Sequence, residues 1–248
     1  MKQFSTVLAL ALAFITIGCS SSNKTTTTPS SAQGVFSGTT SNGSSFQSII
    51  LPNDTFYAIY GTTSGNVFYI SGMMTGQGTS NNGKYTASVT DFYNTGVTYT
   101  GSVNATYVTG ASIAGTVSES GNPNVTFNGA AEPISSFNYS TPALLSSISG
   151  AWTGTLMNGS TATVNINTSG TFSGSDSGCS FSGSLTPDSS GKNFFNISLT
   201  YGASPCASPN QTQAGVAVDY LLSDGVTHQL LAGVASGTTF GTVFVANR

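Results

Sequence analysis

The sequence is poor in charged residues. Lys and Arg number 5 and Asp and Glu 8 among 248 residues, so charged side chains make up 5%, against about 25% in an ordinary soluble domain. A nucleic-acid partner is excluded because it requires clustered Lys and Arg. Helical bundles are excluded because their usual residues, Ala, Glu, Lys, Leu and Arg, are too few. The chain is nevertheless 38% hydrophobic, so most of it is expected to fold.

Catalytic motifs are also lacking. The chain has a single His, His228, in a pattern that predicts a sheet residue in mid-strand. The stretch 174–178 reads GSDSG, but a nucleophile elbow needs Ser where Asp176 stands. The stretch 189–192, SSGK, matches S-x-x-K only within a polar turn and without its companion motifs. We therefore expect no enzyme and no catalytic residue.

The acidic residues show no site pattern. Most stand beside Gly, Ser, Asn or Pro, as turn residues do: Asp54, Asp91, Glu119, Glu132, Asp176, Asp188 and Asp224. Asp219 instead lies in a strand pattern, opposite Val218 and Tyr220, and is expected in solvent. No two are close in sequence, so the facing pair that a glycosidase needs is not indicated. No metal-ligand spacing or phosphate loop occurs, so we expect no metal and no cofactor.

The N-terminus carries an export pattern. After Lys2, an apolar run from Val7 to Ile17 is too short to span a bilayer. The segment 15–19, ITIGC, resembles a bacterial lipobox, with Thr16 where Leu is commonest. The resemblance implies a signal peptide over 1–18, acyl chains (palmitate among them) on Cys19, and anchoring to the outer membrane on its surface or periplasmic face. The alternative is an ordinary signal peptide with a chance Cys.

The following segment, 19–33, is polar and predicts a disordered tether. Cys179 and Cys206 are then an even pair in an oxidising compartment, which predicts a disulfide. Their spacing fits no zinc pattern. Two separate buried thiols are the alternative.

Two copies of one pattern occupy the remainder. GVFSGT at 34–39 corresponds to GAWTGT at 150–155, and an Asn-Gly pair follows in each copy. We expect tandem domains over 34–133 and 150–248, joined by a linker over 134–149. About eight short strands in each copy predict two all-β antiparallel meander barrels, with β-sandwiches as the alternative.

Local patterns add detail to this fold. Val216, Val218, Tyr220 and Leu222 share one face of a strand. The opposite faces of most strands carry Ser, Thr and Asn, which predicts one buried and one wet face. Type I′ turns are predicted at four pairs: Asn42-Gly43, Asn82-Gly83, Asn158-Gly159 and Asp224-Gly225. Thr141 and Pro142 predict the start of a short helix that leads into the second barrel and plugs its end.

Gly150-Ala151-Trp152, preceded by that helix, resembles the G-x-W opening of calycin-type barrels. These include lipocalins, avidins and small periplasmic metalloprotease inhibitors. The first copy has Phe36 at the Trp position. More broadly, the chain looks like the uncharacterised tandem-barrel lipoproteins of Gram-negative bacteria. An avidin-like biotin site needs several Trp, and this chain has 1.

These observations predict a cell-envelope lipoprotein that binds a protein or glycan at the surface without catalysis. The tyrosines of the first copy form either its core or a contact surface: Tyr57, Tyr60, Tyr69, Tyr85, Tyr93 and Tyr99. The alternatives are a periplasmic carrier of a small ligand and a protease inhibitor of calycin-like type. A transmembrane barrel is disfavoured because the copies are too short for eight spans.

Overall fold

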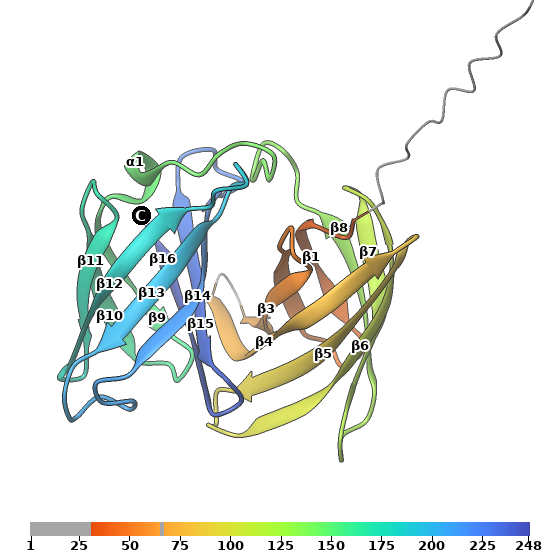
Figure 1. The fold of residues 1–248 in the computed structure, drawn as a ribbon, viewed down its shortest axis with the longest axis horizontal. Helices are drawn as coiled ribbons and strands as arrows, with labels where there is room; N and C mark the ends of the chain where they lie inside the picture. The colour runs from red at the N-terminus through yellow and green to blue at the C-terminus, as the bar shows by residue number, and fades with distance from the viewer. Residues whose placement is uncertain (1–30, 65–66) are drawn as a thin grey trace, which may run out of the picture.

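A computed structural model describes residues 31–64 and 67–248. Their strands form two closed antiparallel barrels of eight strands each (Figure 1), which confirms the expected fold class. The first barrel, barrel 1, consists of β1 (Gly34–Thr40), β2 (Ser45–Ile50), β3 (Thr55–Ser64), β4 (Val67–Asn81), β5 (Lys84–Tyr93), β6 (Thr98–Val108), β7 (Ser112–Glu119) and β8 (Val125–Ala131). The predicted signal peptide and Cys19 lie outside the described residues.

Barrel 2 follows a short helix, α1 (Leu145–Ile148). It consists of β9 (Gly150–Leu156), β10 (Thr161–Ile166), β11 (Thr171–Asp176), β12 (Cys179–Pro187), β13 (Phe195–Tyr201), β14 (Thr212–Leu221), β15 (His228–Ser236) and β16 (Phe240–Asn247). In each barrel, consecutive strands pair, and the last strand pairs with the first. Gly38 faces Gly129 at one closure, and Thr155 faces Val245 at the other.

Each barrel encloses its own apolar core, because alternate residues of every strand point inward. The core of barrel 1 includes Phe36, Phe56 and Tyr85, and that of barrel 2 includes Trp152, Phe172, Phe195 and Phe244. The period-two pattern in the sequence predicted these inward faces correctly for most strands.

A third core lies between the barrels. Outward-facing side chains of β14–β16, among them Val218, Leu231 and Val243, pack against Met73 and Phe92 of barrel 1. Figure 1 shows these strands beside β3 and β4. The backbones approach so closely that a Cβ on Gly233 would lie 2.8 Å from Met73 Sδ. The prediction of one buried and one wet face is therefore wrong for β14, which is buried on both faces.

The structure corrects the turn type predicted for three of the four hairpins. A type I′ turn requires positive φ at both central residues, and of the four predicted pairs Asn82-Gly83 alone has it, at 47° and 79°. At the other three pairs only Gly has positive φ. At Asn42-Gly43, for example, Gly43 N–H donates to Thr40 O and Thr40 N–H donates to Ser44 O. The longer loops there match a type I turn followed by a left-handed Gly.

The linker contains the expected helix, but it begins at Leu145 rather than at Thr141, and no side chain caps it. Ile148 is fully buried and belongs to the core of barrel 2, so α1 plugs that end. Trp152 Nε1 donates a hydrogen bond of 2.7 Å to Ile148 O, and the Arg248 guanidinium stacks 4.2 Å from the Trp152 ring.

Barrel 1 is plugged at the corresponding end by residues that the sequence assigned to the tether. Ala32 is 1% exposed and lies in the core of barrel 1. Its N–H donates to Ser80 Oγ, and the Thr109 hydroxyl donates to Ser31 O. In both repeats, the residues just before the first strand close the barrel.

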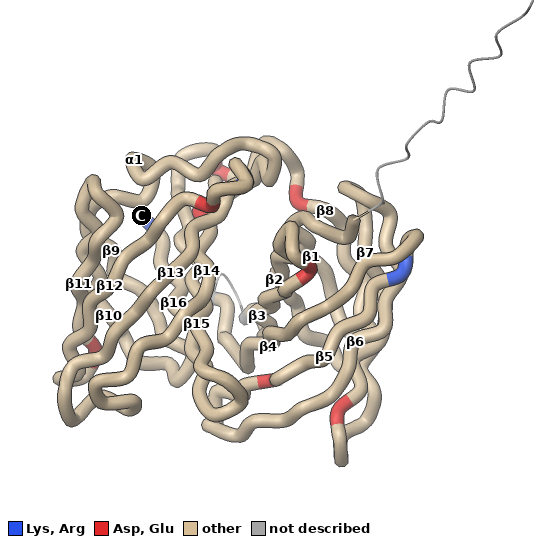
Figure 2. The backbone as a smooth tube through the Cα atoms, in the orientation of Figure 1, with Lys and Arg blue, Asp and Glu red and all other residues tan. Residues whose placement is uncertain are grey.

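Charged residues are few and scattered along the backbone of the described residues (Figure 2). Among those residues, no helix is both long and apolar enough to cross a membrane.

Candidate functional site

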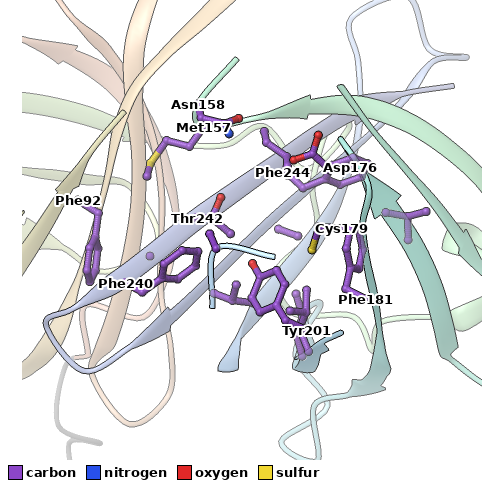
Figure 3. A pocket seen from close by; sticks show the side chains of 18 of the residues that line it. Phe92, Met157, Asn158, Asp176, Cys179, Phe181, Tyr201, Phe240, Thr242 and Phe244 are labelled. Carbon is purple, nitrogen blue, oxygen red and sulfur yellow. The ribbon is translucent and has the colours of Figure 1, made fainter. Parts of the chain in front are cut away.

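Barrel 2 contains a cavity of about 450 Å³ (Figure 3). Its walls are inward-facing apolar side chains from several strands, including Phe181, Leu199, Ala232 and Phe244. The volume lies within the range of small-molecule sites, roughly 300–1,000 Å³. The cavity reaches the hairpin turns at Asn158 and Thr239, whereas α1 fills the other end of the barrel.

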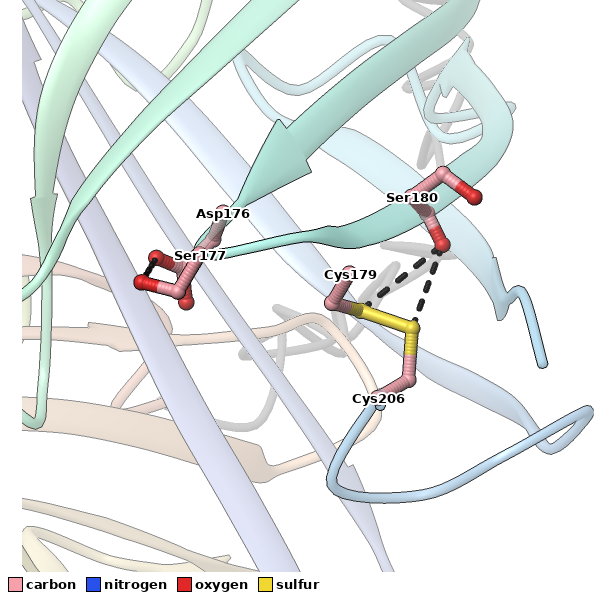
Figure 4. The surroundings of a disulfide bond; sticks show 5 residues. All are labelled: Asp176, Ser177, Cys179, Ser180 and Cys206. Carbon is pink, nitrogen blue, oxygen red and sulfur yellow. Dashed lines mark hydrogen bonds between the residues drawn. A yellow bond between two sulfur atoms is a disulfide. The ribbon is translucent and has the colours of Figure 1, made fainter. Parts of the chain in front are cut away.

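A disulfide holds one edge of this cavity. The bond between Cys179 and Cys206 confirms the predicted pairing. It joins the start of β12 to the loop 202–211 (Figure 4). Cys179 lines the cavity together with Pro205 and Ala207 of that loop. The bridge therefore fixes a loop that forms part of the cavity wall.

One amide in barrel 2 has no partner. Gln213 is 2% exposed, and neither its Nε2 nor its Oε1 has a hydrogen-bond partner among the described residues. It lies on the same face of β14 as the cavity-lining Ala217, and it is paired in register with Leu199. A buried amide without partners costs free energy, so this position favours a polar group from a ligand or water.

Barrel 1 contains a second cavity, of about 370 Å³. Phe46, Ala58, Val103 and Phe127 contribute apolar walls. It reaches the β1–β2 turn at Asn42 and the loop 120–124 that joins β7 and β8. These turns correspond, by strand order, to those at the open end of barrel 2, so the two cavities open at equivalent ends.

The wall of the barrel 1 cavity carries a carboxyl pair. Asp91 of β5 is fully buried, and the Tyr60 hydroxyl donates to its carboxyl at 2.9 and 3.0 Å from the two oxygens. The Asp91 side chain is also hydrogen-bonded to Glu119 of β7. Glu119 lines the cavity, and its Oε2 accepts a hydrogen bond from Asn122 Nδ2 at 2.9 Å.

One of the two carboxyls must carry a proton if they are to form a hydrogen bond with each other. Glu119 Oε1 is buried and has no hydrogen-bond donor if both groups are ionised. Burial raises the pKa of Asp91 to about 8; the hydrogen bond to Glu119 also raises it, and the Tyr60 hydrogen bond opposes the rise. This raised pKa favours the protonated Asp91 carboxyl, whose O–H can donate a hydrogen bond to Glu119.

Local sequence explains how the pair meets. Glu119 is paired with Gly101 of β6, and Gly101 with Val89 of β5, two residue pairs from Asp91↔Tyr99. Gly101 has no side chain to stand between β5 and β7. A Cβ there would lie 2.1 Å from Ser118 O, so this position admits only Gly without a backbone shift.

Tyr93 lies at both cavities. Its ring makes edge contacts with Tyr60 at 6.0 Å and with Tyr99 at 5.4 Å, measured between ring centroids. The chain that follows it, through Gly96 and Val97, also lines the barrel 2 cavity. Barrel 1 therefore contributes part of the wall of the cavity in barrel 2.

Most of the candidate residues discussed in the sequence analysis lie outside the two cavities. Asp219 is not in solvent as expected: its side chain is 7% exposed, and both oxygens lie 3.0 Å from His228 Nδ1. The cause is that the opposite face of β14 packs on barrel 1, which turns Asp219 inward. His228 begins β15 rather than lying in mid-strand.

The other two motifs occupy turns. Ser190 N–H donates to Asp188, and Lys192 lies over the Tyr139 ring, 5.3 Å from its centroid. The Ser177 hydroxyl donates to Asp176, a cavity-lining residue at the end of β11. Among residues 31–64 and 67–248, no group of three His, Cys, Asp or Glu side chains could hold a metal ion.

Sequence reasoning missed the Asp91–Glu119 pair because 27 residues separate the two. The signal that could have found it is the inward parity of Asp91 with Val89 and Tyr85 on β5. Of the six tyrosines considered in the first copy, only Tyr69 is largely exposed, at 57%. The others are buried or half-buried.

Comparison with known proteins gives little further information. No protein-family model matches the chain, and no curated protein matches it. One solved structure is similar: a protein of unknown function of the DUF3598 family from Nostoc punctiforme, 10% identical, covering 87% of this chain and 94% of that chain, with a TM-score of 0.29. A likeness of this degree carries no conclusion about function.

Proposed function

We propose that the protein binds small, largely apolar ligands inside its two barrels. The observation that carries this proposal is the pair of apolar cavities, about 450 and 370 Å³, that open at equivalent ends of the barrels. Small eight-stranded barrels are either filled by side chains or hold one small ligand. Many Phe and Tyr point inward here, yet space for a ligand remains in both barrels.

Polar groups at the cavities support binding of defined ligands rather than of any apolar molecule. A few placed polar groups orient a ligand within an apolar pocket. Asp176 supplies such a group in barrel 2, and Glu119 supplies one in barrel 1.

The test is titration with the neutral fluorescent probe N-phenyl-1-naphthylamine, together with native mass spectrometry of the purified protein. Ala232→Phe fills the barrel 2 cavity and Ala58→Phe the barrel 1 cavity, since both alanines line the walls. Ser198→Phe is the matched control because Ser198 is exposed on the outer face of β13. We expect two sites in the wild type and the control, and one in each filled variant. Absence of saturable binding, or binding that survives both substitutions together, would overturn the proposal.

We further propose that the protein acts in the cell envelope, anchored through Cys19. The support is the lipobox-like segment 15–19. Incorporation of labelled palmitate should be lost in Cys19→Ser and retained in the disulfide variant Cys206→Ser. Protease treatment of intact and lysed cells then distinguishes the surface from the periplasm. Cleavage in intact cells would favour a surface role in binding protein or glycan, and protection until lysis would favour a periplasmic ligand carrier.

A further inference from the structure

The carboxyl pair in barrel 1 has no cationic partner from the chain. The Lys and Arg residues among residues 31–64 and 67–248 are Lys84, Lys192 and Arg248. Lys84 is exposed, Lys192 lies over Tyr139, and Arg248 lies over Trp152. The single His of this part of the chain, His228, is paired with Asp219 in barrel 2. Buried charges are usually paired or neutralised, because an unpaired charge in an apolar site is costly.

The other titratable groups around the pair supply no positive charge. Tyr60 of β3, Tyr93 of β5 and Tyr99 of β6 face it, and Met74 is the register partner of Asp91 on β4. With one proton held by Asp91, the pair carries a net charge of −1. Glu119 presents this charge to the apolar cavity because Glu119 lines the cavity and Asp91 lies behind it.

We propose that the barrel 1 cavity takes an apolar ligand with one protonated amine, which binds the Glu119 carboxyl group. The ammonium group brings the cavity to zero net charge, and the apolar part fills the space between Phe46, Val103 and Phe127. This inference rests on the proposed function and names the ligand class for one of its two sites.

A neutral or anionic head group fits the cavity less well. A hydroxyl can donate one hydrogen bond to Glu119 but leaves its charge unpaired. A carboxylate head group would be repelled by Glu119. The ammonium group both donates a hydrogen bond to Glu119 and neutralises its charge, whereas the hydroxyl only donates the hydrogen bond.

The test uses three probes of equal chain length: octylamine, octanol and octanoate. Each displaces N-phenyl-1-naphthylamine from the full-length Ala232→Phe protein, in which barrel 1 is the site that remains. We expect octylamine to bind at least about tenfold more tightly than octanol, and octanoate to bind most weakly. In Glu119→Gln, octylamine should fall to the level of octanol, and unchanged octanol binding shows that the cavity is intact.

A second readout separates ligand contact from a merely structural role. An ammonium next to the pair favours ionisation of Asp91, so octylamine affinity should rise from pH 6 to pH 9, whereas octanol affinity should stay constant. Asp91→Asn should keep the preference for octylamine and lose this pH dependence, because Asn is the neutral analogue of the protonated acid.

Equal affinities for octylamine and octanol would overturn this inference and leave the proposed function standing. A preference for octylamine that survives in Glu119→Gln would also overturn it. Failure of the fluorescent probe itself to bind either barrel would instead overturn the proposed function. If Glu119→Gln loses octanol as well, the comparison of octylamine with octanol in the Ala232→Phe protein decides.

Discussion

The two barrels share one topology but differ in the chemistry of their interiors. Barrel 1 buries a carboxyl pair and a tyrosine hydroxyl at its cavity, and it has no disulfide. Barrel 2 buries one unpartnered amide, Gln213, pairs the inward-facing Asp219 with His228, and has a disulfide that holds a loop at the cavity edge. The repeated strands therefore form two similar barrels, whereas a few inward-facing residues determine what each cavity can bind.

The plugged ends show a second difference. Trp152 in barrel 2 donates a hydrogen bond to the preceding helix and stacks under Arg248. Phe36, at the equivalent position of barrel 1, is equally buried but has no polar atom in its side chain. In barrel 2, Trp152 therefore connects β9, α1 and the C-terminal residue Arg248 through its side-chain contacts.

The largest expected effect comes from Trp152→Ala, which should break this connection. Removal of a buried aromatic side chain costs about 3–5 kcal/mol, and we expect the loss in barrel 2. Hydrogen exchange resolved by barrel, together with urea unfolding, measures it. Phe36→Ala is the matched variant and should lower protection in barrel 1. Protection lost first in barrel 1 of Trp152→Ala would contradict the assignment of separate interior cores.

Removing the disulfide should make barrel 2 resemble barrel 1 in its covalent structure. The double variant Cys179→Ser/Cys206→Ser frees a loop of 27 residues in sequence separation, which costs roughly 3 kcal/mol in the chain-entropy model. Urea unfolding with and without reductant measures the loss. The reductant should affect the wild type and leave the double variant unchanged. Equal sensitivity of both proteins to reductant would contradict the prediction.

The pH dependence of stability should separate the barrels. The pKa of Asp91 in the folded protein, about 8, is above the ordinary value of 3.8, so the folded state binds more protons than the unfolded state between these values. Stability is therefore greatest at low pH and falls as pH rises toward 8. From pH 6 to pH 8 the expected loss in barrel 1 is about 2 kcal/mol.

Hydrogen exchange at the two pH values, corrected for the intrinsic exchange rate, measures this loss. Asp91→Asn is the control and should remove most of the dependence, because the amide does not ionise. A stability of barrel 1 that rises between pH 6 and pH 8 would show that Asp91 is ionised in the folded state.

The smallest effect concerns the β4–β5 turn of barrel 1. Asn82 has φ of 47° in the β4–β5 hairpin, a conformation that Asn tolerates better than Ala. Asn82→Ala should lower the unfolding free energy by about 1 kcal/mol, and Asn82→Gly should leave it nearly unchanged. Thermal unfolding measures both. An equal loss in the two variants would show that the Asn side chain, rather than its backbone, stabilises the turn.

Much of the fold could be predicted because local patterns encode it. Alternation along each strand gave the inward faces, such as that of Phe195 and Ile197, and the Asn-Gly pairs marked the hairpins. The disulfide followed from counting cysteines. The precise turn type and the first residue of α1 did not follow, because loop length and packing override local preference there.

The candidate site was less predictable. Asp91 and Glu119 meet only because β5, β6 and β7 are neighbours in a closed barrel and Gly101 leaves room between them. Nothing in the spacing of two acidic residues on different strands indicates whether their side chains converge.

The sequence by itself determined the strands, their repetition, the inward faces and the pair of cysteines, since each depends on neighbours along the chain or on composition. Only the tertiary structure decided that the outer face of β14 packs on Met73 and Phe92, which turns Asp219 inward and adds a third core. The tertiary structure also decided that barrel 1 places a carboxyl pair at its cavity. The physical reason is that alternation reveals two faces of a strand, but which surfaces leave water depends on what packs against them.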